Sequence, residues 1–286
     1  MERKKYVEVK LKTSADSGEL LAALSSGSVL GSCEEGGVTR LYWPAELWKP
    51  GYLEEVKRAL DALGQDPAEA GIEVQVVPDR DWNEQWLRSL QPVRVGRIWI
   101  RQSRNRADLK AGEIELVIDP ERAFGSGYHP TTRMLLEWLQ VTVTGGERVL
   151  DIGTGSGVLA MAALRLGCAS ALGIEPDSEA LECAARNARA NRFGPELELR
   201  EISVADLTPG GFDLVLANLD RNTLLAFPAP VMDQVRDGGW ALISGLQPED
   251  GSEVADALSA AGGVVREYRE SEGWLALRVV KRADVH

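Results

Sequence analysis

The stretch VLDIGTGSG, from Val149 to Gly157, decides the expected fold of this chain. An apolar strand candidate ends near an acidic residue and runs into three alternating glycines, Gly153, Gly155 and Gly157. Because glycine lacks a Cβ atom, the backbone of such a turn can approach a ligand closely. Eighteen residues further on, Glu175 ends the apolar run ALGIE, where a carboxylate can bind the two hydroxyls of a ribose. The stretch therefore predicts a nucleotide site.

The flanking segments supply the β-α-β context that such a site needs. Strand candidates at 148–152 and 171–175 alternate with helix candidates at 158–167 and 178–192. A glycine-rich turn alone can be purely structural, but this complete context favours binding. The glycines alternate, whereas a dinucleotide fingerprint reads G-x-G-x-x-G. An NAD-dependent oxidoreductase is therefore the weaker interpretation.

Asp151 and the glycines that follow it resemble the first motif of class I S-adenosylmethionine-dependent methyltransferases, written D/E-x-G-x-G-x-G. This resemblance implies an α/β catalytic domain with a Rossmann-like, seven-stranded, mostly parallel sheet. It also implies S-adenosyl-L-methionine as the cofactor and S-adenosyl-L-homocysteine as the product.

Length and composition limit the remaining possibilities. A chain of 286 residues is expected to form two domains, and a hydrophobic content of 44% suffices for full cores. The net charge of -12 argues against nucleic acid as the main partner. Three cysteines without a C-x-x-C pair, Cys33, Cys168 and Cys183, favour packing roles in a reducing compartment. No apolar run approaches the ~18 residues of a membrane span, so a cytoplasmic protein is expected.

Residues 1–78 alternate strand and helix candidates in the order β-α-β-β-α-β, which predicts a small ferredoxin-like α+β domain. Its elements are expected near 6–12, 17–26, 28–32, 38–43, 53–63 and 72–78. This domain has no evident catalytic residues and is interpreted either as a scaffold or as a platform for the substrate. Residues 79–91 predict a linker helix with Trp82 and Trp86 on one face, and residues 92–286 form the expected catalytic domain.

A second motif, AFGSGYHPTT at residues 123–132, precedes an apolar helix candidate. Gly125 and Gly127 allow a turn, and Pro130 suits the first turn of a helix. The motif resembles the AFGTGTHPTT signature of the PrmA family, which methylates the eleventh protein of the bacterial large ribosomal subunit. The similarity covers most of the chain, including DRDWNEQWL, DLVLANLDRNTLLAF and EGWLALRVVKR. It implies a protein methyltransferase acting on lysine side-chain and N-terminal amines, with residues 1–78 as the substrate-recognition domain.

The resemblance also assigns site residues. Those implied or expected to bind the cofactor are Thr132, Asp151, Gly153, Gly155, Gly157, Glu175 and Asn218. Asn218 also has the expected role of positioning the amine. His129 is a weaker catalytic candidate, because a ring at a helix start can equally hold the loop. No residue stands out as a certain general base, and no metal is expected.

This sequence departs from the family pattern in three places: the first concerns the ribose of the cofactor and keeps the same chemistry, and the other two are expected to border the acceptor pocket. Glu175 stands where the family commonly has Asp, and Tyr128 replaces a Thr. Leu219, Asp220 and Arg221 occupy a triplet that is usually Ile-Leu-Ala or similar. These changes leave open a related lysine methyltransferase with another protein acceptor. A non-catalytic nucleotide-binding module is a further alternative, and the oligomeric state is open.

Overall fold

The computed structural model describes residues 5–13, 15, 20, 23, 24, 29, 31–35, 37–78, 92–119, 125 and 127–283, with only the backbone given for 31 and 33–35. The chain divides into two compact units, residues 1–90 and 91–286. The linker helix expected at 79–91, with Trp82 and Trp86, lies outside the described residues, as do most of the helix expected at 17–26 and the side chain of Cys33.

The first unit contains a four-stranded antiparallel sheet with the order β2-β3-β1-β4. The strands are β1 (Lys5–Leu11), β2 (Gly31–Glu35), β3 (Val38–Pro44) and β4 (Glu73–Pro78), and helix α2 spans Gly51–Ala62. Side chains alternate along β1 and β3, so that Val9, Leu41 and Trp43 face α2 and form the core with Leu60. This strand order fits a ferredoxin-like sandwich, which stays a prediction because one of its helices is not described.

The second unit is built on a seven-stranded sheet with the order β10-β9-β8-β11-β12-β14-β13. Five neighbouring strands run parallel, and β14 is antiparallel to both β12 and β13. The prediction of a mostly parallel seven-stranded sheet is confirmed. The strands are β8 (Arg148–Ile152), β9 (Ser170–Ile174), β10 (Leu197–Arg200), β11 (Phe212–Asn218), β12 (Val235–Leu246), β13 (Gly263–Ser271) and β14 (Trp274–Lys281).

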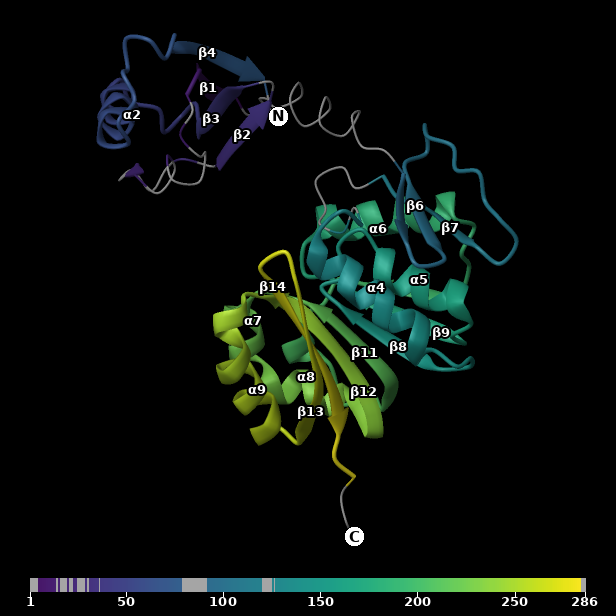
Figure 1. Ribbon diagram of the computed structural model, residues 1–286. Coiled ribbons are helices and arrows are strands. Elements are labelled where there is room, and N and C mark those ends of the chain that lie inside the picture. The colour runs from purple at the N-terminus through teal and green to yellow at the C-terminus, as the bar shows by residue number, and fades with distance from the viewer. Residues whose placement is uncertain are drawn as a thin grey trace. The chain divides into compact units, whose positions relative to one another are not determined.

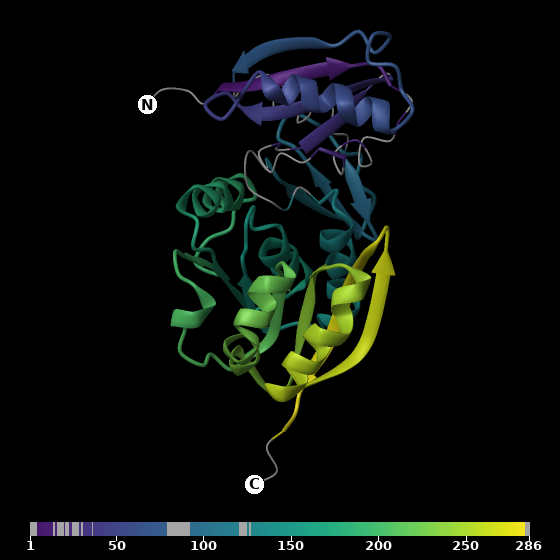
Figure 2. The same ribbon diagram turned by 90° about the vertical axis from the view of Figure 1, so that its left-hand side faces the viewer.

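Helices cover both faces of this sheet (Figure 1). One side carries α4 (Pro130–Thr142), α5 (Val158–Leu166) and α6 (Ser178–Ala190), and the other carries α7 (Arg221–Ala226), α8 (Pro228–Gln234) and α9 (Gly251–Ala260). Figure 2 shows the hairpin of β13 and β14 at one edge. Neighbouring residues of one strand join opposite cores, Val149 on the α4 and α5 side and Leu150 on the α8 and α9 side. This alternation makes the central strands apolar on both faces.

A small three-stranded sheet extends the second unit beside α4 and α6. It consists of β5 (Val93–Val95), β6 (Ile98–Arg101) and β7 (Ile114–Val117). The side-chain amide of Asn191, the C-cap residue of α6, donates to the carbonyl of Val117 at 2.7 Å and accepts from its N–H at 2.8 Å. Asn187 accepts from the N–H of Asp119 at 3.0 Å. Side chains of α6 thus replace a neighbouring strand at the edge of β7.

Two simple expectations can be compared with this part of the chain. Cys168 and Cys183 are buried, as expected for packing roles. Among the described residues, no helix combines the length and apolar character required to cross a bilayer.

Trp138 of α4 connects the helix layer to the β13 strand. It is fully buried, its indole N–H donates to Glu267 at 3.1 Å, and the Arg269 guanidinium lies 4.8 Å from its ring. We expect Trp138→Ala to lower the free energy of unfolding by about 3–5 kcal/mol, since it leaves a large cavity. Urea unfolding followed by circular dichroism measures this. Val141→Ala on the exposed face of the same helix is the control and should change stability by less than about 0.5 kcal/mol. If both changes lowered the free energy of unfolding by the same amount, Trp138 would not be the core residue that the structure indicates.

Candidate active site

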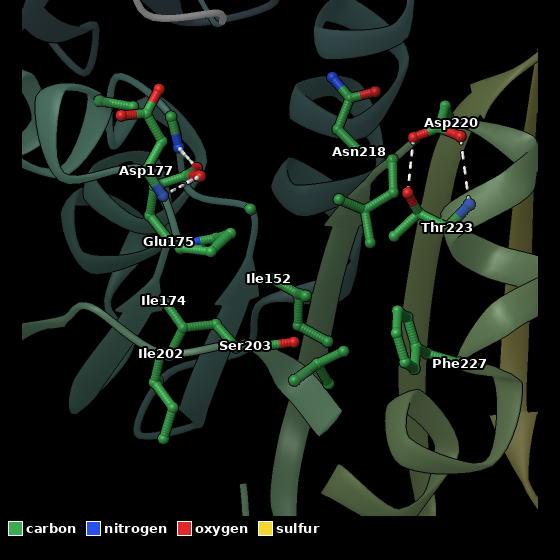
Figure 3. Close-up of a pocket in the computed structure, with 16 residues that line it drawn as sticks. Ile152, Ile174, Glu175, Asp177, Ile202, Ser203, Asn218, Asp220, Thr223 and Phe227 are labelled. Carbon is green, nitrogen blue, oxygen red and sulfur yellow. Dashed lines mark hydrogen bonds between the residues drawn. The ribbon is translucent and has the colours of Figure 1, made fainter. Parts of the chain in front are cut away.

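A cavity of about 400 Å³ lies at the carboxyl ends of β8, β9 and β11. Ligands of open α/β sheets bind at this edge of the sheet. Figure 3 shows two walls that face each other, one with Glu175, Asp177 and Ile202, the other with Asn218, Asp220, Thr223 and Phe227. The full lining is Ile152, Gly153, Gly155, Ile174, Glu175, Pro176, Asp177, Ala180, Ile202, Ser203, Val204, Asn218, Leu219, Asp220, Thr223 and Phe227.

The glycine turn forms the floor of the cavity between β8 and α5. Gly153 and Gly155 have φ of 67° and 52°, in the left-handed region that favours glycine. The Gly153 N–H donates to the Ile174 carbonyl at 2.9 Å, which ties the turn to the end of β9. A Cβ atom on Gly153 would lie 2.7 Å from Cδ2 of Leu219. On the side that faces Leu219, the turn therefore has space for the backbone but not for a side chain.

Asp151 holds the turn from behind. It is buried, and its Oδ2 accepts from the Thr154 hydroxyl at 2.7 Å and from the Ala160 N–H at 3.2 Å. Its Oδ1 has no hydrogen-bond partner among the described residues. Burial raises the pKa of Asp151 to about 7, the negative charge of Glu175 adds to the shift, and the two hydrogen bonds oppose it.

Glu175 lines the cavity at the end of β9. Its Oε2 accepts from the Gly155 N–H at 3.1 Å, and its Oε1 accepts from the Asp177 N–H at 3.3 Å. These two bonds fix the direction of the carboxylate, while each oxygen keeps a lone pair for another donor. The arrangement can accept hydrogen bonds from two neighbouring hydroxyls.

The opposite wall follows the end of β11. Asp220 caps α7, because its carboxylate accepts from the Thr223 N–H at 3.1 Å and from the Thr223 hydroxyl at 2.6 Å. The bond from the Thr223 hydroxyl is the main cause that lowers the pKa of Asp220, so this carboxylate is charged at neutral pH. Arg221 turns away from Asp220 toward Asp250 and Glu253, with which it forms ion pairs.

Asn218 joins this wall to α4. Its side-chain N–H donates to the Thr132 hydroxyl at 3.3 Å, and Thr132 is itself buried in the first turn of α4. The bond uses one N–H of the amide and leaves the carbonyl oxygen as an acceptor. Two segments that lie far apart in the sequence thereby meet at the site.

His129 and Tyr128 do not line the cavity. The His129 ring lies edge-on to Trp274, with centroids 4.6 Å apart, and its Nδ1 is 2.7 Å from the Thr131 hydroxyl. Burial lowers the pKa of His129, so the ring is neutral at pH 7. These contacts favour a role in holding the loop before α4.

The predicted residues thus fall into two groups. Gly153, Gly155, Glu175 and Asn218 line the cavity, as does Leu219 with Asp220. Thr132, Asp151 and Gly157 lie behind it, and a Cβ on Gly157 would be 3.2 Å from Met161 Cε. The described residues contain no group of three His, Cys, Asp or Glu side chains suited to a metal ion.

Sequence reasoning missed part of the lining, namely Ile202, Ser203, Val204 and Phe227. The first three follow the end of β10, the next parallel strand in the sheet. The rule that placed Glu175 after β9 applies to them equally, because the carboxyl ends of parallel strands meet at one edge. Phe227 lies between two short helices and carried no comparable signal.

The comparisons with known proteins agree with this architecture. The family model described as "Ribosomal protein L11 methyltransferase (PrmA)" matches residues 42–282. A protein named ribosomal protein L11 methyltransferase from Cupriavidus pinatubonensis is 39% identical over 223 residues, 78% of this chain and 73% of the relative. One of the same name from Halalkalibacterium halodurans is 31% identical over 248 residues, 85% of this chain and 79% of the relative.

A solved structure, the ribosomal protein L11 methylase from Lactobacillus delbrueckii subsp. bulgaricus, has a TM-score of 0.62 and 23% sequence identity. The match covers 68% of this chain and 99% of that one, which shows a common fold. With a family model that matches most of its length and relatives above 30% identity, this chain belongs to the ribosomal protein L11 methyltransferase (PrmA) family.

Proposed function

We propose that this protein is an S-adenosylmethionine-dependent methyltransferase that modifies lysine side-chain and N-terminal amines of the eleventh protein of the large ribosomal subunit. The observation that carries the proposal is the convergence of Gly153, Glu175 and Asn218 on one cavity in a member of this family. The relatives' names support the choice of acceptor.

The cavity suits the nucleoside part of S-adenosylmethionine. Glu175 is held so that it can accept from both ribose hydroxyls, and Gly153 and Gly155 line the cavity with backbone that carries no side chain. Apolar side chains of Ile174, Ile202 and Phe227 offer surfaces for a flat base. When bound, S-adenosylmethionine supplies an electrophilic methyl group on a positively charged sulfur. Thr132, Asp151 and Gly157 support the turn and its neighbours from behind.

The protein's own task is to bring an unprotonated amine into line. Free lysine has a pKa near 10.4, so the site must desolvate the amine or release its proton to water. The carbonyl oxygen of Asn218, with its amide N–H bonded to Thr132, can accept from the amine and orient it. His129 supports the adjacent loop, and its contacts with Trp274 and Thr131 argue against proton transfer as its main role.

We assign substrate recognition to the first unit, with the ferredoxin-like domain expected at 1–78. Residues 79–91 are proposed to be the linker, and residues 92–286 are proposed to carry out catalysis. Leu219 and Asp220 line the cavity beside Asn218 and bear on acceptor choice. Modification of a ribosomal protein is consistent with a cytoplasmic location.

Labelled S-adenosylmethionine and a mixture of ribosomal proteins test the acceptor directly. We expect label in the eleventh large-subunit protein, at lysine side chains and at the N-terminus. Label in another protein would identify a different acceptor. Binding of the labelled compound without any transfer would indicate a non-catalytic module, and binding of NAD in its place would indicate an oxidoreductase.

Gly153→Ala tests the glycine turn. The new Cβ would contact Leu219 and occupy a φ of 67°, so we expect affinity for S-adenosylmethionine to fall at least a hundredfold in calorimetry. Gly211→Ala is the matched control, with a φ of 58° and no atom near its Cβ. Retained affinity in Gly153→Ala would show that the ligand does not approach this turn.

Glu175→Gln tests the ribose contact. Hydrogen bonds to a charged group contribute about 1.5–3 kcal/mol, so the Kd for S-adenosylmethionine should rise roughly tenfold to a hundredfold. Glu175→Asp keeps the charge and should recover most of the affinity. Unchanged binding by the Gln variant would place the ribose elsewhere.

Asp151 predicts a specific pH dependence of stability. Its pKa is about 7 in the folded protein and near 3.9 in an unfolded chain, so the folded state binds the extra proton between these values. Relative to Asp151→Asn, the wild-type free energy of unfolding should be greatest below about pH 4 and fall as the pH rises to about 7. Urea titrations of both proteins at several pH values measure this difference, and a constant difference would refute it.

A further inference from the structure

The segment from β5 through β6 into the β6–β7 crossover, residues 94–112, has a charge opposite to that of the whole protein. The chain carries a net charge of -12, yet residues 94–112 contain six cations and one acid, Asp108. The cations are Arg94, Arg97, Arg101, Arg104, Arg106 and Lys110. Such local clustering, more than net charge, determines whether a surface attracts phosphates.

Two of these cations are neutralised within the fold. Arg94 pairs with Glu113 at 2.9 Å and lies over the Trp99 ring, and Arg101 pairs with Glu115 at 2.6 Å. The other four, Arg97, Arg104, Arg106 and Lys110, are exposed and form no salt bridge within the described part of the chain. Their charges are therefore available to a partner.

The topology distributes these four residues along the small sheet. Strands β6 and β7 are parallel, so residues 102–113 must run back from the end of one strand to the start of the other. Arg104 and Arg106 follow the end of β6, whereas Lys110 precedes β7 and Arg97 precedes β6. Four residues of strand span roughly 13 Å, the rise of about four nucleotides of one strand in a duplex.

One end of this row lies beside the loop that leads into α4. A Cβ on Gly127 would be 2.5 Å from Cδ1 of Ile100, and the charge of Arg104 acts on the Tyr128 phenol. That loop continues to Thr132, which holds Asn218 at the cavity. The cationic row thus begins beside the loop that precedes α4.

The chemistry of the segment favours a repeating anion over a folded protein surface. Protein interfaces need buried apolar anchors, and among the described residues of 94–112 only Leu109 is a large apolar side chain with substantial exposure, 43%. Arginine, which predominates here, binds phosphate oxygens through two parallel N–H groups. We propose that the β6–β7 crossover, together with the turn before β6, is an RNA-binding surface that contacts the phosphate backbone through Arg97, Arg104, Arg106 and Lys110. The remaining acidic surface would keep RNA from other faces.

The test is fluorescence anisotropy of the full chain with a fluorescein-labelled 20-nucleotide RNA stem-loop across salt concentrations. We expect Arg104→Gln, Arg106→Gln and Lys110→Gln together to weaken binding at least tenfold at low salt. The slope of log K against log salt should fall in magnitude by about 2–3, since each of the three lost phosphate contacts contributes about 0.7–0.9. Arg104→Lys with Arg106→Lys should retain most of the binding.

The matched control removes the same total charge from exposed arginines elsewhere, by Arg58→Gln, Arg189→Gln and Arg282→Gln. It should bind RNA within twofold of wild type, and both triple variants should keep wild-type affinity for S-adenosylmethionine, which shows that they fold. No RNA binding by wild type at low salt, or equal weakening in the control, would overturn the proposal. Tighter binding to polyglutamate than to RNA would overturn it in favour of an acidic protein partner.

Discussion

A single buried carboxylate organises the turn on which the site depends. The Oδ2 atom of Asp151 accepts hydrogen bonds from the Thr154 hydroxyl and from the Ala160 N–H, and so links the end of β8 to the first turn of α5. A charge in this position is costly, as its raised pKa indicates. The protein retains it because the glycine turn has few side chains of its own that can fix its path. The buried carboxylate lowers the local stability, and it also holds the flexible glycine-rich turn in one conformation.

Strand order then brings the side chains of the candidate site together. Because β9 and β11 both neighbour β8 and run parallel to it, Glu175 and Asn218 reach the same cavity from opposite sides. Each is oriented by a partner from another segment, Gly155 for Glu175 and Thr132 for Asn218. The site is therefore assembled by the sheet, and the loops supply its detail.

The sequence was most informative where local chemistry and fold coincide. The range of β8 was predicted to the residue. Gly153, Gly155 and Glu175, which line the cavity, could be proposed from the sequence because a glycine turn and a carboxylate at a strand end indicate a site without knowledge of tertiary contacts. Phe227 could not be predicted, since an aromatic residue between two short helices reaches the cavity only through packing. Asn187 and Asn191 were missed for a related reason, because their amides pair with a backbone some seventy residues away.

Those two amides also bear on how this scaffold can change. An open strand edge can pair with strands of other chains. At β7 this edge is covered by the side chains of Asn187 and Asn191. The small sheet is consequently fastened to the large unit by side chains and shares no main-chain ladder with the seven-stranded sheet. Insertions and deletions in its crossover leave the register of the large sheet intact. The appended sheet is thus a region where a lineage can acquire new surface chemistry while the nucleotide-binding half stays unchanged.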